Sequence, residues 1–260
     1  MPVAPALEAV GVRKTYGDGT TALAGVDLAV ATGETLALVG ESGSGKTTLL
    51  RLWNRMVEPT SGEARVEGRA VRDLDPIELR LRIGYVPQDG GLLPHWTVFE
   101  NVALVPRLLG WEPRRRRERA REMLELVGLD PGLHGERYSA ELSGGQRQRA
   151  AFARALAGDA AIVLLDEPFG ALDALTRQEL QQQFLELKGR LGKTMTLVTH
   201  DLGEAFRLGD RIGVMRGGRL LRLDTPEEIA RHPGDDYVRR LLDLRAGLDP
   251  APIPGGASAL

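Results

Sequence analysis

The sequence predicts an α/β protein with a largely parallel sheet, an N-terminal antiparallel β subdomain and an inserted α-helical subdomain. Three short apolar runs, at residues 35–40, 161–166 and 194–200, have the length and continuity of buried strands. Helical patterns separate these runs, and strands that alternate with helices are typical of β-α-β units and parallel sheets. The 260 residues are enough for one large domain with a subdomain.

The composition narrows the class of protein. The chain has 36 acidic and 34 basic residues, so its net charge does not indicate a nucleic-acid partner. It has no cysteine, which excludes disulfides, thiolate metal sites and a cysteine nucleophile and is compatible with the cytosol. No apolar run approaches the roughly 18 residues of a membrane span, and the N-terminus has no signal-peptide pattern. We therefore expect a soluble protein that serves a membrane, if at all, through a partner.

The remaining elements follow in chain order. Residues 7–34 show short strands joined by turn residues, which predicts the antiparallel subdomain. A helix over 46–56 follows the first apolar strand, and a nearly continuous helical pattern ending at Gly158 predicts a helical subdomain over about 90–158. The last segment, 246–260, is rich in Pro, Gly and Ala, so we expect it to be a disordered tail.

The stretch "GESGSGKT" predicts a phosphate-binding loop. It matches the pattern G-x-x-x-x-G-K-[ST], with a strand before it and a helix after it. Glycines let such a loop wrap so that backbone N–H groups point at phosphate oxygens. The lysine would reach the β- and γ-phosphates, and the threonine after it would hold Mg²⁺. The predicted nucleotide-binding residues are Gly40, Ser42, Gly43, Ser44, Gly45, Lys46, Thr47 and Thr48.

The stretch "AIVLLDEP" supplies two carboxylates. Asp166 ends an apolar strand, which places it beside the phosphate loop where it can hold Mg²⁺. Glu167 follows, in a position to polarise an attacking water, so hydrolysis of the nucleotide is favoured over binding alone. Kinases and helicases share these features, whereas a GTPase would need an N-K-x-D motif, which the sequence lacks.

The stretch "LSGGQRQRA" raises a separate question. Ser143 and Gln146 have the spacing of a capping box, which satisfies free backbone donors at a helix start. A capping box does not explain the two glycines between them, Gly144 and Gly145, because glycine destabilises a helix relative to alanine. A helix N-terminus with bare backbone attracts anions. The stretch therefore predicts a second anion site, apart from the phosphate loop.

Together these motifs resemble the ATP-binding cassette of ABC transporters. The order is phosphate loop, Gln88, "LSGGQ", the strand with Asp166 and Glu167, and a strand-ending His200. The resemblance covers about residues 7–240, and the combination is far more specific than any single motif. It implies a P-loop NTPase core of the RecA-like type and an ABC ATPase domain over residues 1–245, which binds ATP and Mg²⁺.

The resemblance also implies roles for individual residues. Tyr16 would stack on adenine, although a simple packing role is the alternative. Gln88 would sense Mg²⁺ and the attacking water and would contact a membrane partner through the loop that follows it. His200 would act as a γ-phosphate switch beside the catalytic Glu167. Asp173 would contact the second cassette of a dimer.

A head-to-tail dimer would answer the question raised by "LSGGQ". In the family, the stretch of one cassette faces the γ-phosphate held by the other. Ser143, Gly144, Gly145 and Gln146 would then meet the partner's ATP. The resemblance thus implies a homodimer at the cytoplasmic face of the inner membrane, beneath transmembrane permease subunits that receive solute from a solute-binding protein.

The segment around "LPHWTVFENVAL" lies where the family contacts its transmembrane domain, although Trp96 could instead be a core residue. The basic stretch 113–122 alternates arginines with Glu118 and Glu122, which favours a solvated helix face over nucleic-acid binding.

Residues 53–68, 75–88 and 100–111 most resemble the cassettes of quaternary-amine importers, which take up glycine betaine, choline or carnitine. Many of those cassettes are followed by a pair of regulatory CBS domains, and the sequence ends before such a pair. The alternatives are an importer of an amino acid, sugar or anion and, less favoured, a non-transport ABC ATPase.

Overall fold

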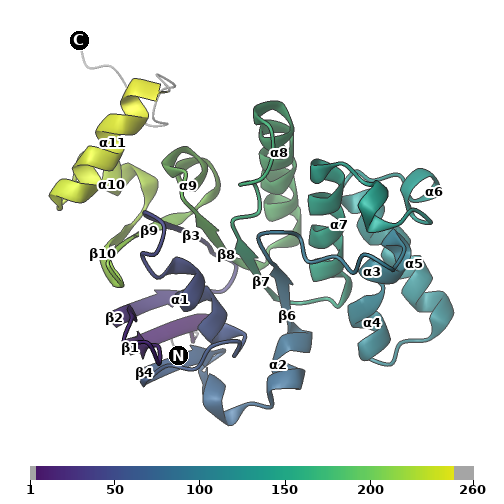
Figure 1. The fold of residues 1–260 in the computed structure, drawn as a ribbon, viewed down its shortest axis with the longest axis horizontal. Helices are drawn as coiled ribbons and strands as arrows, with labels where there is room; N and C mark the ends of the chain where they lie inside the picture. The colour runs from purple at the N-terminus through teal and green to yellow at the C-terminus, as the bar shows by residue number, and fades with distance from the viewer. Residues whose placement is uncertain (1–3, 249–260) are drawn as a thin grey trace.

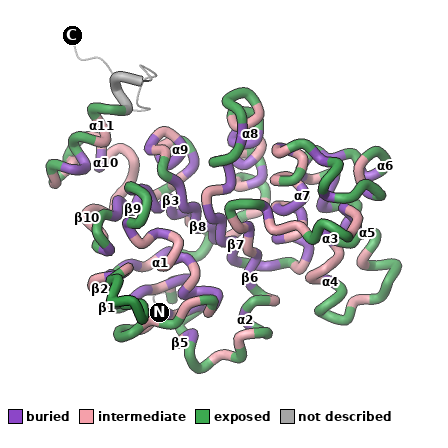
Figure 2. The backbone as a smooth tube through the Cα atoms, in the orientation of Figure 1, coloured by how far each residue is buried: buried purple, intermediate pink, exposed green. Residues whose placement is uncertain are grey.

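The computed structural model describes residues 4–248 and confirms the predicted α/β fold (Figure 1). Two sheets form its framework, one with six strands and one with four. Figure 1 shows the antiparallel sheet beside α1 at one end of the molecule and the helical subdomain at the other. Figure 2 shows the buried backbone concentrated in the strands and in the helix faces that pack on them.

The six-stranded sheet has the order β10-β9-β3-β8-β7-β6. Its strands from β9 to β6 are parallel, and β10 pairs with β9 antiparallel at one edge. Every residue of β3, β7 and β8 is buried, which is why these strands appear in the sequence as continuous apolar runs. The bounds are β3 Thr35–Val39, β6 Ile83–Val86, β7 Ile162–Asp166, β8 Thr194–Thr199, β9 Arg211–Arg216 and β10 Arg219–Asp224.

The antiparallel pairing expected for the N-terminal segment is confirmed in β1 and β2, and the sheet that they form has the order β2-β1-β4-β5. It comprises β1 Leu7–Thr15, β2 Thr21–Val30, β4 Ser61–Val66 and β5 Arg69–Ala70. Helix α1 packs between the two sheets, and the buried indole of Trp53 donates to the Glu8 carbonyl at 2.8 Å. Helix α1 (Lys46–Trp53) ends before the predicted residue 56, because Arg55 takes a left-handed φ of 55° that cannot continue the helix.

The helical elements between β6 and β7 lie within residues 90–158. Helix α7 is rich in alanine, and its small buried side chains let α5 and the strands approach closely around one core. Its C-cap is Gly158. The elements are α3 Val98–Val102, α4 Leu104–Leu108, α5 Pro113–Leu126, α6 Pro131–His134, the 3₁₀ turn η2 Ser139–Glu141 and α7 Gly144–Ala157.

The remaining helices flank the six-stranded sheet, except η1, which packs on β4 of the antiparallel sheet. The N-terminal part of α11 packs with α9 and α10 on the β3–β9 region through Tyr237 and Val238. The bounds are η1 Val71–Asp73, α2 Pro76–Arg82, α8 Ala174–Leu191, α9 Leu202–Leu208, α10 Pro226–Arg231 and α11 Asp236–Leu248. Helix α11 thus includes the first three residues of the predicted tail 246–260, and 249–260 lie outside the described residues.

Candidate functional site

The phosphate loop joins β3 to α1, as predicted, and its backbone path depends on glycine. Gly40 has a φ of 154°, and a Cβ there would lie 2.1 Å from the Met215 carbonyl oxygen. Gly45, the N-cap of α1, has a φ of 101°, and a Cβ there would lie 2.3 Å from the Ala22 carbonyl oxygen. Larger residues would therefore push the loop away from β9 and β2. The loop ends at the N-terminus of α1, where backbone N–H groups and the helix dipole favour an anion.

Lys46 is buried within this loop, with 5 % of its surface exposed. Its Nζ donates to the Gly40 and Glu41 carbonyls at 2.8 Å each and to Ser44 Oγ at 3.2 Å. Burial lowers the pKa of Lys46, and the carboxylates of Glu167, Asp166 and Glu41 counteract part of this effect. A phosphate group would offer this cation a full negative charge in place of neutral oxygens.

Asp166 sits at the carboxyl end of β7 and is 2 % exposed. Its Oδ1 accepts from Thr47 Oγ1 at 2.7 Å. Its Oδ2 accepts from Arg51 and from the Tyr85 hydroxyl, both at 3.3 Å. The Thr47 and Asp166 oxygens are thus adjacent hard ligands of the kind that Mg²⁺ prefers, and Mg²⁺ usually takes its other ligands from substrate phosphates and water.

The carboxylate of Glu167 contacts two other predicted site residues, His200 and Gln88. Its Oε2 lies 3.2 Å from His200 Nδ1 and accepts from Gln88 Nε2 at 3.3 Å. Gln88 makes this contact with its amide nitrogen, so its amide oxygen, the atom that could bind Mg²⁺, is not used in it. Glu167 also has a φ of 47°, a left-handed conformation that is costly for a residue with a side chain. Such strain, held at one residue of a polar cluster, is characteristic of functional sites.

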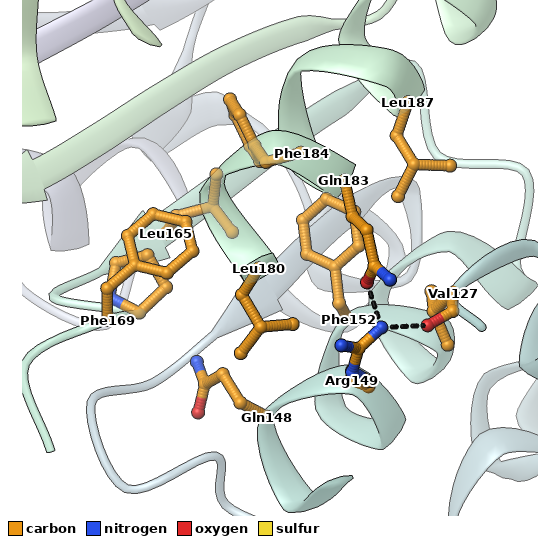
Figure 3. A pocket seen from close by; sticks show the side chains of 11 residues that line it. Val127, Gln148, Arg149, Phe152, Leu165, Phe169, Leu180, Gln183, Phe184 and Leu187 are labelled. Carbon is orange, nitrogen blue, oxygen red and sulfur yellow. Dashed lines mark hydrogen bonds between the residues drawn. The ribbon is translucent and has the colours of Figure 1, made fainter. Parts of the chain in front are cut away.

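The loop after Glu167 is anchored on α8 by Phe169. Its ring packs edge-to-face on Phe184, with centroids 6.2 Å apart. Both rings line a cavity of about 30 Å³ between α7 and α8, whose rim carries the hydrogen bonds from Arg149 to Gln183 and to the Val127 carbonyl (Figure 3). The cavity is lined mainly by apolar side chains, among them the packed rings of Phe152, Phe169 and Phe184, so we interpret it as part of the packing between α7 and α8.

Tyr16 lies in the turn after β1, upstream of the phosphate loop. Its ring is 40 % exposed, and Lys14 Nζ lies 5.1 Å from the ring centroid. The hydroxyl of Tyr16 is 3.3 Å from Thr48 Oγ1 in α1. The ring is therefore tied to the start of α1 and remains partly exposed, so a planar group could stack on it.

The start of α7 has the predicted capping box. Ser143 Oγ accepts from the Gln146 N–H at 3.2 Å, and Gln146 Oε1 accepts from the Ser143 N–H at 2.9 Å. The two glycines differ in a way that the sequence does not reveal. A Cβ on Gly145 would lie 2.5 Å from Thr176 Cγ2 in α8, whereas a Cβ on Gly144 would make ordinary contact with Leu172 at 3.5 Å. Packing within the chain thus explains Gly145 and does not explain Gly144.

Asp173 is exposed and caps α8, where its carboxylate accepts from the Thr176 N–H at 3.0 Å. This backbone hydrogen bond lowers the pKa of Asp173. In Figure 1, α7 lies beyond β7 and α8 as seen from α1, the helix that begins at the phosphate loop.

His95 and Trp96, in the segment expected to meet a transmembrane partner, precede α3. His95 is exposed, and Trp96 is half-buried, with the Arg107 guanidinium 5.5 Å from its ring centroid. The basic stretch 113–122 forms most of α5, and its arginines pair with carboxylates such as Glu118 at 2.8 Å and Glu122 at 2.8 Å. This arrangement agrees with the predicted solvated face.

Sequence reasoning missed several residues that hold the site. Arg51 was detectable in principle, because it follows Thr47 by one helical turn and so shares its face of α1. For Tyr237, no sequence pattern indicates a contact with the phosphate loop. Its hydroxyl accepts from the Glu41 N–H at 3.2 Å, while Arg216 stacks on its ring and lies 3.5 Å from the Glu41 carboxylate. The first turn of α11 therefore contacts the phosphate loop.

Comparison with known families gives a direct match. The family model described as "ABC transporter" matches residues 23–170, which include the phosphate loop, the start of α7 and Glu167. The chain belongs to the ABC transporter family. The resemblance found in the motifs is therefore confirmed.

Solved structures of ABC cassettes share the fold. The dimeric post-hydrolysis ATP-binding cassette MJ0796, bound to ADP and Pi, superposes with a TM-score of 0.76 at 36% identity, covering 85% of this chain and 98% of that chain. The cbiO1 subunit of Clostridium perfringens, part of the ABC transporter complex cbiONQ, gives a TM-score of 0.80 at 26% identity, covering 94% of this chain and 95% of that one.

The curated relatives are ATP-binding proteins of transport systems. The chain is 46% identical to the choline transport ATP-binding protein OpuBA of Bacillus subtilis over 89% of its own length and 60% of the relative's. It is 45% identical to the osmoprotectant import protein OsmV of Salmonella typhimurium, over 89% and 63%. It is 46% identical to the glycine betaine uptake protein YehX of Escherichia coli, over 82% and 72%. The chain thus spans about 60% of the length of the first curated relatives that it matches.

Proposed function

We propose that this ABC chain binds and hydrolyses ATP and energises the import of a small quaternary-amine solute. The single observation that carries the ATPase assignment is the Glu167 cluster beside the phosphate loop. Lys46 and the α1 N-terminus would bind the phosphates, and Thr47 and Asp166 would hold Mg²⁺, which supplies charge neutralisation when it is bound. Glu167 would accept a proton from the attacking water, with His200 and Gln88 orienting it.

The carboxylate of Glu167 is suited to this task. Its Oε2 is shared by a ring nitrogen of His200 and the amide of Gln88, so the side chain is held in one rotamer at the rim of the site. A base that is already oriented loses little entropy when the substrate arrives. Tyr16 would stack its partly exposed ring on the adenine.

We further propose that two copies of the chain form the complete site. The α7 N-terminus, with Ser143, Gly144, Gly145 and Gln146, would meet the phosphates held by the second copy, and Asp173 would contact it. Support comes from Gly144, because packing within the chain does not require glycine at this position, and from the dimeric form of the related cassette MJ0796.

The transport partners follow from the relatives. Proteins for choline, osmoprotectant and glycine betaine transport share 45–46% identity with this chain, which supports the same class of solute. We propose that the chain works at the cytoplasmic face of the membrane, with permease subunits at the loop after Gln88 and a solute-binding protein beyond them. None of the helices within residues 4–248 is long and apolar enough to cross a bilayer, so the permease would provide the membrane path.

Reconstitution tests this proposal. The chain would be assembled in liposomes with the permease and solute-binding protein encoded beside it, and ATP hydrolysis would be measured with glycine betaine, choline or carnitine, and with amino acids and sugars as controls. Stimulation by a quaternary amine alone is the expected result. Stimulation by another solute would refute the proposed substrate class and leave the ATPase assignment standing.

A further inference from the structure

A buried carboxylate, Glu204, lies outside the site described above. It belongs to α9 and is 6 % exposed. Its Oε2 accepts from the Thr199 hydroxyl at 2.6 Å, and its Oε1 accepts from Gln181 Nε2 at 3.0 Å. Burial raises the pKa of Glu204, while the hydrogen bond from Thr199 acts in the opposite direction. Burying a carboxylate costs free energy, and an apolar residue of similar size would often stabilise the fold at least as well. The presence of Glu204 here therefore suggests that its hydrogen bonds serve a purpose other than stability.

The first of these bonds leads to His200. The Thr199 hydroxyl that donates to Glu204 also accepts from the Asp201 N–H at 3.0 Å. The Thr199 hydroxyl therefore links Thr199 and Asp201, the two neighbours of His200, and its hydrogen bond to Glu204 fixes its orientation. Asp201 also caps α9 by accepting from the Gly203 N–H at 2.7 Å. The turn that carries His200 is thus held at both ends, although the imidazole itself is exposed.

The other bonds of Glu204 lead to α8 and the loop before it. Gln181 lies in α8, and Arg177, one turn earlier, has its Nε 4.0 Å from Glu204 Oε1. The same guanidinium donates through its terminal nitrogen to the Leu172 carbonyl at 3.0 Å. Leu172 directly precedes Asp173. A short chain of polar contacts therefore joins the His200 turn to the segment that presents Asp173.

We propose that Glu204 is a positioning residue that keeps His200 against Glu167 and links that contact to the Asp173 segment. The proposal rests on the proposed function, in which His200 serves hydrolysis and Asp173 meets the second copy. A movement of the Asp173 segment would shift Arg177 and Gln181, and the buried carboxylate would transmit the shift to Thr199. Glu204 would act through Thr199, Gln181 and Arg177 and would not itself contact the nucleotide.

The Glu204→Gln variant tests the link with little change in volume. An amide offers one oxygen to the two donors, Thr199 and Gln181, and presents its NH₂ to the other. We expect kcat for ATP hydrolysis to fall about tenfold, the scale expected when a hydrogen bond to a buried charged group is lost. The KM for ATP should not change, because the phosphate loop is untouched. The matched control is Glu186→Gln, an exposed carboxylate on α8.

Two variants at Thr199 test the same link without relying on Glu204→Gln. Thr199→Val deletes the hydroxyl at nearly constant shape, while Thr199→Ser retains it. The valine variant should show the same loss of kcat at unchanged KM, and the serine variant should restore activity. This pair remains informative if Glu204→Gln fails to fold. A purely structural role predicts instead that both variants at Thr199 lose stability and keep the kcat of their folded fraction.

An NMR measurement checks the position of the imidazole in the single chain. The chain has four histidines, so the ring signals are assignable by substitution. Glu204→Gln and Thr199→Val should shift the His200 signals and leave those of His232 in place. Unmoved His200 signals together with normal kcat in both variants would overturn the proposal. A wild-type protein that hydrolyses no ATP would instead refute the proposed function, and the NMR result would still decide whether Glu204 positions His200.

Discussion

Replacing Gly145 by alanine separates the packing role of the "LSGGQ" glycines from their proposed role in the dimer. The new Cβ would lie 2.5 Å from Thr176 Cγ2, so α7 and α8 must move apart or Thr176 must change rotamer. At Gly144 the same substitution makes only ordinary contacts, with Leu172 at 3.5 Å and Arg147 at 4.0 Å. The two variants add the same methyl group to neighbouring positions and differ only in what it meets.

The expected change in stability combines two terms. Overpacking of this kind costs about 1–3 kcal/mol. Alanine recovers up to about 1 kcal/mol of helix propensity relative to glycine. The net loss of about 1 kcal/mol for Gly145→Ala corresponds to a fall in Tm of about 2–4 °C in a domain of this size. Gly144→Ala should leave Tm unchanged or slightly raised.

Thermal unfolding of the nucleotide-free protein measures both values. The double variant Gly145→Ala with Thr176→Ser removes the offending methyl group and should recover most of the loss. A Gly145→Ala protein as stable as the wild type, or one that Thr176→Ser does not rescue, would show that Gly145 is not required by α8. Gly144→Ala should nevertheless reduce ATP hydrolysis, because its methyl group occupies the space in front of α7 where the second copy's phosphate is proposed to sit.

Four further outcomes are expected. Glu167→Gln should bind ATP and form a stable dimer with negligible hydrolysis, and normal turnover would remove its role as base. Burial lowers the pKa of Lys46 in the folded protein, whereas in the unfolded chain the ammonium keeps its proton up to about pH 10.5. Between these two pKa values the unfolded chain binds more protons, so the free energy of unfolding of the wild type, relative to that of Lys46→Met, should rise with pH. A difference in urea unfolding that does not change with pH would contradict this. Tyr237→Phe should weaken ATP binding severalfold in calorimetry by releasing the Glu41 N–H, whereas Tyr138→Phe, on an exposed ring, should not. Ser143→Asp should keep the α7 cap and Tm but prevent the ATP-dependent dimer seen by light scattering.

The parallel strands and the phosphate loop could be predicted because their signals are local. Strands β3, β7 and β8 are buried throughout, so no polar alternation obscures them, and the loop needs its glycines at fixed positions. Strands β9 and β10, at one end of the sheet, were missed. Gly213 interrupts the apolar sequence pattern of β9. The reason for glycine at this position is a tertiary contact, since a Cβ there would lie 2.8 Å from Leu38 Cδ2.

The same limit applies to the site. The sequence supplies Thr47, Asp166 and Glu167, because a strand end and a motif place them. It does not supply Tyr85, which reaches Asp166 from the neighbouring strand. Nor does it reveal that Thr176, far along the chain, decides why Gly145 must be glycine. Contacts between distant segments are set by packing, and no local pattern records them.

Ser143 shows how a capping residue and an anion-binding residue can be one and the same. Its hydroxyl oxygen accepts from the Gln146 N–H, which uses one lone pair and leaves the O–H bond to donate. Gln146 in turn satisfies the Ser143 N–H, so the capping box uses the N–H groups of Ser143 and Gln146 and not those of Gly144 and Gly145. The helix start is therefore stable in the single chain and still offers a hydroxyl proton, bare backbone and the positive end of a dipole to an oxygen from elsewhere. Stability and recognition draw on different atoms of the same residues, so the capping interpretation of "LSGGQ" does not compete with the dimer interpretation.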